Sequence, residues 1–418
     1  MNRPLLGHPS KSITGTVNDY LAGRCIILGL TGSVSLYKSI DAARWLMRRG
    51  ARVVPVMTQP AASLVGPMLL QWATGEKPIV ELTGEVEHIQ LSKGCDAMLV
   101  APATLSTMSK IAHGIADNPV ALTAIAVRGE GKPVMIVPAM HQNMMDSRVY
   151  ADVVDRLSSM GYVVMPPRVE EGIAKYPDTW VVARAAAALA SRGRDLAGES
   201  VLVTAGATRE WIDPTRFLSN PSTGRMGIEL AVEAWARGAT VSLVYGHVEH
   251  VIPHMVEARR VTTTEEMASA VRALADEGRF NYLIAAAAPA DYKSKTRWGE
   301  KLRSGIKDLI LELEGTPKVI EGLAERVDVL VAFAAETARG VEDLYRAALD
   351  KMKKYGASIV VANNVGSKEA GFASEYLDAL LLWKTNSTIA KEYIGRIDKE
   401  ILSRTILDLA KNIREGGL

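Results

Sequence analysis

The sequence is poor in cysteine, because Cys25 and Cys95 are the only two among its 418 residues. Two cysteines cannot form the disulfide framework that staples small secreted domains, and they cannot supply a cysteine-rich metal cluster. Both lie in apolar, strand-like surroundings. We therefore expect them to be buried structural thiols.

The chain also lacks a strong charge of either sign and long apolar runs. Its net charge of +2 gives no electrostatic reason to expect binding to nucleic acid or to an acidic membrane. No apolar run reaches the roughly 18 residues that a membrane span needs. Residues 1–20 are polar and have no apolar core of the kind found in a signal peptide. These features predict a cytoplasmic protein without a membrane or nucleic-acid partner.

Strand and helix patterns alternate along the whole chain, which favours an α/β fold with parallel sheets. A length of 418 residues suggests two or three domains. In the first half we expect strands at 25–30, 53–57, 97–100, 134–137 and 160–165, with helices at 36–48 and 179–191. In the second half we expect strands at 200–203, 240–245, 282–287, 329–334, 359–362 and 377–383, with helices at 226–237, 265–277, 341–355 and 397–413.

A short, charged, glycine-bearing stretch at 192–198 has the character of a linker. We therefore predict two doubly wound, Rossmann-like domains at 1–192 and 193–418. Neither half opens with the G-x-G-x-x-G pattern of dinucleotide-binding domains, since the first turn reads Gly29-Leu30-Thr31-Gly32-Ser33. A dinucleotide cofactor is thus poorly supported.

The most informative stretch runs from residue 203 to 227. A strand-like run ends in Thr204-Ala205-Gly206, and a polar loop leads to Ser222-Thr223-Gly224-Arg225-Met226-Gly227 before an apolar helix. Backbone N–H groups and hydroxyls at a helix N-terminus form a natural anion site, and Asn220 lies beside it. This segment resembles the signature of phosphopantothenate–cysteine ligases. In the bifunctional coenzyme A biosynthesis proteins such a ligase is fused to a flavin-dependent decarboxylase.

The first half carries motifs that fit this second activity. The turn Thr31-Gly32-Ser33 suits a phosphate, although it is equally compatible with a plain strand-to-helix turn. Further along come Val86-Glu87-His88-Ile89-Gln90-Leu91, Ala101-Pro102-Ala103-Thr104-Leu105-Ser106 and Pro138-Ala139-Met140-His141. This ordered set, within residues 24–180, resembles the flavoprotein family of cysteine decarboxylases and implies a flavodoxin-like domain.

That resemblance implies a site for FMN lined by Gly32, Ser33, Thr58, Thr104 and Ser106. His88 falls on the catalytic histidine of the family, although a lone histidine is more often structural. The flavin would carry the redox work, while the protein would supply orientation and proton transfer.

The first half departs from the family pattern at two places. His141 stands where the family usually has an asparagine that contacts the substrate carboxylate. The segment 168–176, where many members have a flap cysteine that donates a proton, contains none. The final proton donor is therefore open between Lys175, Tyr176 and water.

The second half carries the remaining ligase motifs in order. Amide formation requires a carboxylate to be activated by a nucleoside triphosphate with Mg²⁺, through an acyl nucleotidylate and pyrophosphate. Ala285, Ala286 and Ala287 would let a nucleotide approach the backbone, and Asp291 would contact the nucleoside. Lys301 corresponds to the catalytic lysine, and Asn220 would assist the acyl intermediate. The resemblance assigns further nucleotide contacts to Thr316, Phe333, Lys351 and Tyr355.

Taken singly, these residues have ordinary alternatives. An exposed lysine is most often a solvated charge, and a phenylalanine at a strand end is most often part of the core. The order of the motifs favours the functional interpretation. A group of three histidines at 247, 250 and 254 lacks a cysteine or carboxylate to complete a metal site, and we expect it to be a loop. The ligands of any metal remain unassigned.

The predicted function is coenzyme A biosynthesis with 4′-phosphopantothenate, L-cysteine and CTP as substrates. The preference for CTP over ATP follows from the family alone. Two alternatives remain, namely a flavin-binding regulatory subunit and, for the first half, a flavin prenyltransferase. The decarboxylase family forms trimers and the ligase half resembles dimers. A homo-oligomer is therefore expected, and the two symmetries together would give a dodecamer.

Overall fold

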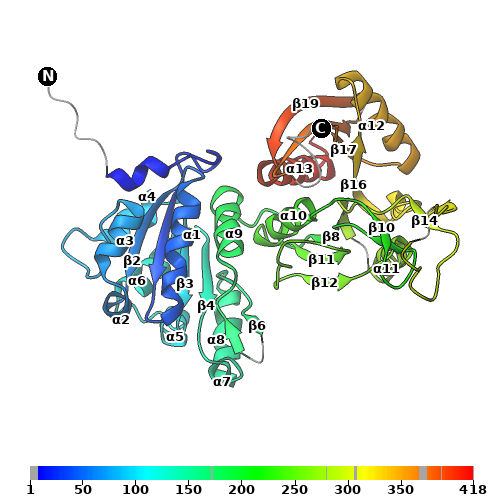
Figure 1. Ribbon diagram of the computed structural model, residues 1–418. Helices are drawn as coiled ribbons and strands as arrows, with labels where there is room; N and C mark the ends of the chain where they lie inside the picture. Colours follow the sequence, from blue (N-terminus) through cyan, green and yellow to red (C-terminus); the bar gives the residue numbers. More distant parts are fainter. Residues whose placement is uncertain are drawn as a thin grey trace. The chain divides into compact units, whose positions relative to one another are not determined.

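The computed structural model describes residues 8–170, 173–278, 280–305, 308–366, 374–386 and 388–417. The chain divides into two compact units, Met1–Asp195 and Leu196–Leu418. In Figure 1 they run from blue to green and from green to red. This division lies three residues from the boundary that the sequence predicts, at 192/193. Each unit is described here by itself.

The first unit is built around a parallel sheet. Its strands are β1 (Cys25–Leu30), β2 (Arg52–Met57), β3 (Ala97–Ala103), β4 (Val134–Pro138) and β5 (Val163–Val164). They lie in the order β2-β1-β3-β4-β5. Every residue of β1, β3 and β4 is buried. Such continuous burial is typical of parallel strands covered on both faces, and it explains their unbroken apolar runs.

The helices of this unit include several that the sequence patterns did not assign. Those described are α1 (Tyr37–Met47), α2 (Gln59–Leu64), α3 (Pro67–Thr74), α4 (Glu87–Gly94), α5 (Leu105–Ala112), α6 (Pro119–Gly129), α7 (Gln142–Met145), α8 (Arg148–Ser159) and α9 (Thr179–Arg192). The expected strand at 160–165 shrinks to the two residues of β5, because α8 continues to Ser159 and a left-handed Gly161 follows it. A short hairpin of β6 (Arg168–Glu170) and β7 (Ile173–Lys175) precedes α9.

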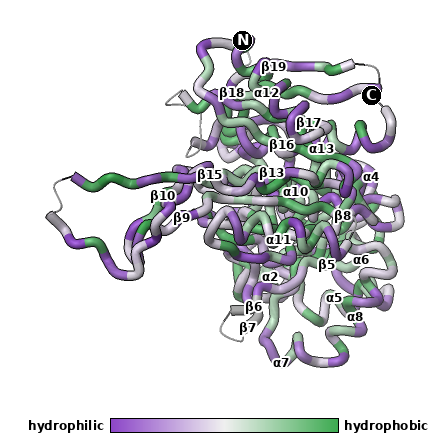
Figure 2. Tube along the Cα trace, turned by 90° about the vertical axis from the view of Figure 1, so that its right-hand side faces the viewer, coloured by the Kyte–Doolittle hydropathy of each residue, from purple (hydrophilic) through white to green (hydrophobic). Residues whose placement is uncertain are grey.

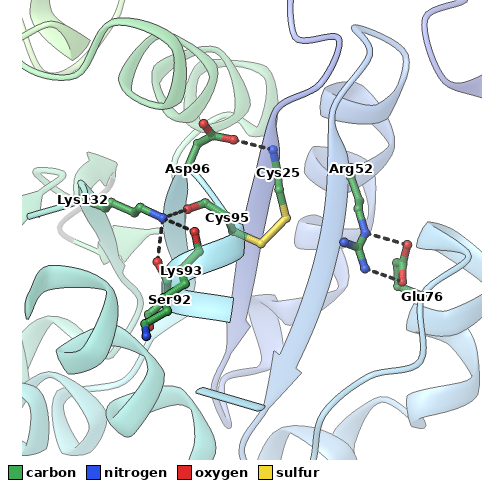
Figure 3. The surroundings of a disulfide bond; sticks show 8 residues. All are labelled: Cys25, Arg52, Glu76, Ser92, Lys93, Cys95, Asp96 and Lys132. Carbon is green, nitrogen blue, oxygen red and sulfur yellow. Dashed lines mark hydrogen bonds and ion pairs between the residues drawn. A yellow bond between two sulfur atoms is a disulfide. The ribbon is translucent and has the colours of Figure 1, made fainter. Parts of the chain in front are cut away.

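The prediction of two free thiols is wrong, because Cys25 and Cys95 form a disulfide across 70 residues of chain (Figure 3). Cys25 is the first residue of β1, and Cys95 lies two residues before β3, which pairs directly with β1. The parallel register, with Ile26 opposite Ala97, brings the two Cα atoms to 4.5 Å from each other. The sequence separation conceals this proximity, since it arises from strand pairing.

The second unit contains a larger, mixed sheet. Its strands are β8 (Ser200–Ala205), β11 (Thr240–Tyr245), β12 (Glu257–Arg260), β13 (Phe280–Ala285), β16 (Val327–Glu336), β17 (Ile359–Asn364), β18 (Tyr376–Lys384) and β19 (Ile389–Asp398). The order is β12-β11-β8-β13-β16-β17-β18-β19. Strand β18 pairs antiparallel with both β17 and β19, so this sheet is mixed at one edge and parallel from β12 to β17. The last helix accordingly begins at Lys399 rather than at 397, because β19 ends at Asp398.

The helices described in this unit are α10 (Arg225–Ala236), α11 (Thr264–Glu277), α12 (Val341–Tyr355) and α13 (Lys399–Arg414). Two small ribbons, β9 (Arg209–Trp211) with β10 (Phe217–Ser219) and β14 (Tyr292–Ser294) with β15 (Leu313–Gly315), lie outside the main sheet. Figure 2 shows β9, β10 and β15 at the base of an arm that extends away from the sheet. No helix in the described ranges is long and apolar enough to cross a membrane.

The disulfide predicts a measurable contribution to the stability of the first unit. Replacing both Cys25 and Cys95 by serine removes a cross-link that closes a 70-residue separation, which restricts the unfolded chain. We expect the free energy of unfolding of this unit to fall by about 2–4 kcal/mol. Urea denaturation with and without a reductant tests this, because the reductant should destabilise the wild type and leave the double variant unchanged. Two alkylatable thiols in the unreduced wild type would contradict it.

Candidate functional site

A cavity of about 350 Å³ in the second unit lies where the carboxyl ends of β8, β13, β16 and β17 meet. Its walls include Thr204, Ala285, Phe333 and Asn363 from these four strands. From β8 the sheet extends to β11 on one side and to β13 on the other. Ligands of open α/β sheets bind at such a reversal of strand order, so the position of the cavity is that of a substrate site.

Most of the residues predicted for the ligase site line this one cavity. They are Asn220, Ala285, Ala286, Ala287, Asp291, Thr316, Phe333, Lys351 and Tyr355. The structure adds residues that the sequence interpretation left without a role, namely Arg225, Lys318, Asn363 and Lys399. Lys318 follows Thr316-Pro317 directly and lies within the same loop, so the motif itself was the signal that pointed to it.

Asn220 is held in a fixed orientation. Its Nδ2 donates to the carbonyl oxygens of Ala288 at 3.1 Å and of Pro289 at 3.0 Å. Both amide hydrogens are therefore used by the loop that follows β13. The Oδ1 atom remains as the acceptor that the side chain offers to a ligand.

Two glycines let the loops behind the cavity pack closely. Gly206 and Gly224 both have positive φ angles, of 77° and 76°. A Cβ on Gly206 would lie 2.2 Å from the carbonyl oxygen of His247, and one on Gly224 would lie 2.3 Å from Cγ1 of Val248. Other residues would collide there, which explains the glycines of the 203–227 signature.

Lys318, Lys351 and Asp291 form the first of two cationic groups in the cavity wall. The Lys318 ammonium lies 2.6 Å from Oδ1 of Asp291, and this hydrogen bond raises the pKa of Lys318 against the effect of burial. Burial lowers the pKa of Lys351, although Glu336 and Asp291 oppose this change. Lys354 also acts on Lys351, so three lysines and two carboxylates leave this group with a net positive charge, as binding of a polyphosphate requires.

The second cationic group lies at the starts of α10 and α13. Arg225 is the first residue of α10 and forms ion pairs with Glu375 at 2.7 Å and Glu229 at 3.5 Å. Lys399 is the first residue of α13 and is only 3% exposed. Burial, together with Arg225, lowers its pKa to about 8, although Asp398 and Glu375 act in the opposite direction. The same two cations add to burial in lowering the pKa of His250.

Lys399 is an unfavourable residue for stability at this position. A lysine at a helix N-terminus opposes the helix dipole, and its burial removes water from the ammonium. Perturbed groups of this kind cluster at functional sites. Together with the free N–H groups of α10, Lys399 and Arg225 make this end of the cavity suitable for an anion.

The structure places Thr316 and Lys301 in surroundings that the sequence did not reveal. The Thr316 hydroxyl donates to the carbonyl oxygen of Ala290 at 2.6 Å, so its one donor fixes the loop and its oxygen remains only as an acceptor for a ligand. Lys301 is exposed and is not among the residues that line the cavity. The structure therefore does not bring Lys301 together with the other ligase residues.

Asp213 ties the segment around Lys301 to the β9–β10 ribbon. It accepts hydrogen bonds from the backbone N–H groups of Thr215 at 2.7 Å, Arg216 at 2.8 Å and Leu302 at 3.1 Å. Its side chain is inaccessible to solvent, and burial alone would raise its pKa; the hydrogen bonds that it accepts hold the pKa well below the usual range. No sequence motif pointed to this residue.

In the first unit, the residues predicted for FMN gather at the carboxyl ends of adjacent strands. Gly32 and Ser33 follow β1, Thr58 follows β2, and Thr104 and Ser106 follow β3. Thr58 and Thr104 cap the N-termini of α2 and α5 by accepting from Ala61 and Thr107. The order 2-1-3-4-5 reverses between β1 and β3, which is where flavodoxin-like sheets bind FMN.

The geometry at this edge fits a flavin phosphate. Thr31 links the two loops, because its hydroxyl donates to the carbonyl oxygen of Pro102 at 2.8 Å and accepts from the N–H of Thr104 at 2.9 Å. A Cβ on Gly32 would lie 2.7 Å from Cβ of Pro60. The resulting cradle of glycine, hydroxyls and helix N-termini is chemically suited to a phosphate group.

His88 is the second residue of α4, next to a strained turn. Val86 has a φ of 50°, an outlying value for a β-branched residue, and such strain is often found at functional sites. Thr83 stabilises the turn, since its N–H donates to a carboxylate oxygen of Glu87 at 3.1 Å. The Nδ1 atom of His88 is buried and has no hydrogen-bond partner among the described residues. A buried ring nitrogen without a partner is a candidate for contact with a substrate or cofactor.

His141 and the flap region lie on other elements. His141 is the exposed N-cap of α7, three residues after the end of β4, and makes no capping hydrogen bond with its side chain. The expected flap falls largely on β6 and β7, and residues 171 and 172 lie outside the described ranges. Tyr176 is 4% exposed, and burial raises the pKa of its hydroxyl far above its usual value. A hydroxyl with so raised a pKa stays protonated but is a weak acid, which makes Tyr176 a poor proton donor by itself.

The histidines at 247, 250 and 254 belong to the loop after β11. The carbonyl oxygen of His247 accepts from the N–H of Ala207 at 3.0 Å, so this residue has a structural contact. Within the described parts of the chain, no group of three or more histidine, cysteine or carboxylate side chains is placed to hold a metal ion.

Comparison with known proteins divides the chain in the same way. The family model "DNA/pantothenate metabolism flavoprotein C-terminal domain" matches residues 196–413, and the model "Flavoprotein" matches residues 15–190. The curated coenzyme A biosynthesis bifunctional protein CoaBC of Thermococcus kodakarensis is 38% identical over 409 residues, covering 96% of this chain and 98% of the relative. This chain belongs to the coenzyme A biosynthesis bifunctional protein family.

Further members show the same full-length match. The CoaBC proteins of Methanocaldococcus jannaschii and Escherichia coli are each 31% identical, covering 97% and 93% of this chain and 98% and 97% of their own lengths. Among solved structures, the C-terminal domain of a CoaBC protein matches with a TM-score of 0.42 and 28% identity over 53% of this chain and 98% of its own. At that TM-score the match adds nothing to the topology, and membership of the CoaBC family rests on the sequences.

The buried ammonium of Lys399 predicts a pH dependence. Its folded pKa, about 8, lies below the ordinary 10.5, so the unfolded chain binds more protons between these values. Stability should therefore rise with pH through this window, by about 3 kcal/mol relative to Lys399→Met, which cannot titrate. Denaturation of the second unit between pH 8 and 10.5 tests this difference. The exposed Lys353→Met is the matched control and should follow the wild type; equal slopes for Lys399→Met and wild type would refute the assignment.

Proposed function

We propose that this chain catalyses two consecutive steps of coenzyme A biosynthesis. The second unit joins L-cysteine to 4′-phosphopantothenate with CTP, and the first unit decarboxylates the product to 4′-phosphopantetheine with FMN. The observation that carries this proposal is the single cavity at the carboxyl ends of β8, β13, β16 and β17, which gathers nine of the predicted ligase residues. The full-length family match supports the pairing of the two activities.

The two cationic groups of the cavity match the two anionic substrates of the ligation. We assign the triphosphate to the group of Lys318, Lys351 and Asp291, and the 4′-phosphate of phosphopantothenate to Arg225, Lys399 and the N-terminus of α10. Phe333 would cover the base, and the alanines after β13 leave room for the nucleoside. Tyr355 extends the wall beside Lys318, whose pKa it helps to raise.

In the first step of the ligation, the carboxylate of phosphopantothenate attacks the α-phosphorus of CTP. Pyrophosphate leaves, and an acyl cytidylate forms. The amine of cysteine then attacks the acyl carbon, and CMP leaves. The fixed Oδ1 acceptor of Asn220 is suited to orient the incoming amine through one of its N–H bonds.

Mg²⁺ would be held mainly by the nucleotide. Magnesium typically takes one or two protein carboxylates together with substrate phosphates and water. Lys351 lies in the cavity wall, and Asp291 and Glu336 are the carboxylates whose negative charges act to raise its pKa. We therefore propose these two as the protein's contribution. Lys301 stays a predicted catalytic residue, on the exposed segment that Asp213 anchors through Leu302.

In the decarboxylase unit, FMN would be held by Gly32, Ser33, Thr58, Thr104 and Ser106. When bound, FMN supplies the electron acceptor that loss of carbon dioxide from a cysteine moiety requires. His88 would transfer a proton or orient the substrate through its unpaired Nδ1. His141, exposed at the start of α7, would contact the substrate carboxylate, and Lys175 or Tyr176 would donate the final proton.

The family resemblance also supports a proposal on location and assembly. We propose a cytoplasmic homo-oligomer in which trimers of the first unit and dimers of the second combine as a dodecamer. The mass of the holoenzyme in solution distinguishes this assembly from a simple dimer or trimer.

The ligase assignment predicts a selective effect of Asn220→Asp. A carboxylate cannot donate to the carbonyl oxygens of Ala288 and Pro289, so the side chain loses its fixed orientation. We expect ligation to fall about 100-fold, comparable to the loss of one oriented polar group in an active site. Pyrophosphate release with CTP or ATP and carbon dioxide release from supplied phosphopantothenoylcysteine measure the two halves separately. Asn412→Asp, at an exposed position of α13, is the control.

With CTP, the wild type should release pyrophosphate from ligation and carbon dioxide from decarboxylation of the ligated product. With ATP, it should release less of each. Asn220→Asp should retain carbon dioxide release from the supplied intermediate. Wild-type ligation in this variant would remove Asn220 from the site. Absence of both products in the wild type, loaded with FMN, would overturn the proposed function.

The decarboxylase assignment predicts that His88→Asn loses activity but keeps its flavin. General acid–base catalysis contributes about 10²–10⁴-fold, so we expect carbon dioxide release to fall by at least 100-fold. Flavin content, read from absorbance, should stay unchanged because the predicted phosphate cradle lies on other loops. His113→Asn, at the exposed end of α5, is the matched control. An active His88→Asn enzyme would exclude His88 from the chemistry.

A further inference from the structure

Helix α4, which carries His88, has little intrinsic stability. It is eight residues long, and an isolated helix of that length is marginal in water. Of those eight residues, all of which the structure describes, Ser92 alone is buried. Its apolar contacts come from Leu91, which is partly buried against the core, and from packing on α6. Polar and covalent contacts at the carboxyl end of α4 add to this packing.

Lys132 binds the carboxyl end of this helix. Its Nζ lies 2.7 Å from each of three carbonyl oxygens, those of Ser92, Lys93 and Cys95 (Figure 3). An ammonium group has three N–H donors, so this contact uses all of them. The same contact satisfies carbonyls that lack partners within the helix and places a cation at the negative end of the helix dipole.

The disulfide anchors the same end covalently. Cys95 is the C-cap of α4, and Cys25 begins β1, which lies between β2 and β3 in the sheet. A carboxylate oxygen of Asp96 accepts from the N–H of Cys25 at 2.8 Å, and its other oxygen pairs with Arg24 at 2.7 Å. Helix α4 is thus attached to a central strand of the sheet by one covalent bond and several polar contacts.

We propose that the Cys25–Cys95 disulfide and Lys132 form a clamp that positions His88 for decarboxylation, so that reduction of the disulfide slows this step and leaves ligation unchanged. The proposal rests on the catalytic assignment of His88. His88 lies seven residues before Cys95, which corresponds to about 10 Å along a helix. Loss of the anchor lets the helix shift or fray, and a misplacement of about 1 Å in an active site can cost about 100-fold in rate.

Reduction requires a dithiol reagent that supplies two electrons and two protons. The Cys25–Cys95 bond breaks, two protein thiols form, and the reagent closes to its own disulfide. Cys25 and Cys95 are only 5% and 4% exposed, so the reagent reaches them only when the structure opens locally. The clamp is therefore a durable support that responds slowly to reductant.

The test uses the FMN-loaded full chain, in which the ligase half serves as an internal control. The variants are Cys25→Ser with Cys95→Ser, Lys132→Met, and the wild type treated with dithiothreitol. We expect kcat for decarboxylation to fall at least tenfold in each, with KM, flavin content and ligation close to wild type. Lys132→Arg retains a cation and donors, and it should recover part of the loss. The exposed Lys77→Met, in the same unit but outside α4, should behave as wild type.

Hydrogen exchange of the α4 amides gives a readout that does not depend on the role of His88. Faster exchange in α4 together with the loss of kcat supports the clamp. Unchanged exchange in α4 overturns it, whatever the activity. Faster exchange with unchanged kcat also overturns it, provided that His88→Asn is inactive. If His88→Asn is itself active, the failure lies in the proposed role of His88, and the positioning proposal falls with it.

Discussion

Both halves of this molecule depend on the parallel pairing of strands. Parallel neighbours end at the same edge of a sheet, so the loops that leave them are brought together however far apart they lie in sequence. In the first unit this gathers the turns after β1, β2 and β3. In the second unit it gathers residues from Thr204 to Asn363 around one cavity. Strands β18 and β19 are added to the second sheet beside β17 through antiparallel pairs. They leave the parallel order of β8, β13, β16 and β17 intact.

The ligase cavity holds its cations at a cost to folding. Burial lowers the pKa of both Lys351 and Lys399, which means that the charged ammonium groups are less favourable there than in water. Such groups stabilise an anionic ligand more strongly than exposed lysines, because less water screens the interaction. A site that binds two phosphorylated substrates gains affinity from the same burial that reduces stability.

The two units position their reactive side chains differently. His88 lies on a short helix that is attached to the sheet by a disulfide and by Lys132, next to the strained Val86. Lys301 lies on an exposed segment, held near its base by the hydrogen bonds of Asp213. The first arrangement favours a fixed geometry, whereas the second leaves the lysine outside the cavity that contains its predicted partners.

The sequence by itself determined the α/β class, nearly all of the main strands and the family, because buried parallel strands are apolar without interruption and the loop motifs need particular small and polar residues. It did not reveal β12, which is exposed throughout, or β19, in which one residue of ten is buried. Only the tertiary structure decided the pairing of Cys25 with Cys95, the burial of Lys399 and the bond that occupies Thr316. Each of these depends on contacts between residues distant in sequence, and such contacts cannot be predicted from local sequence patterns.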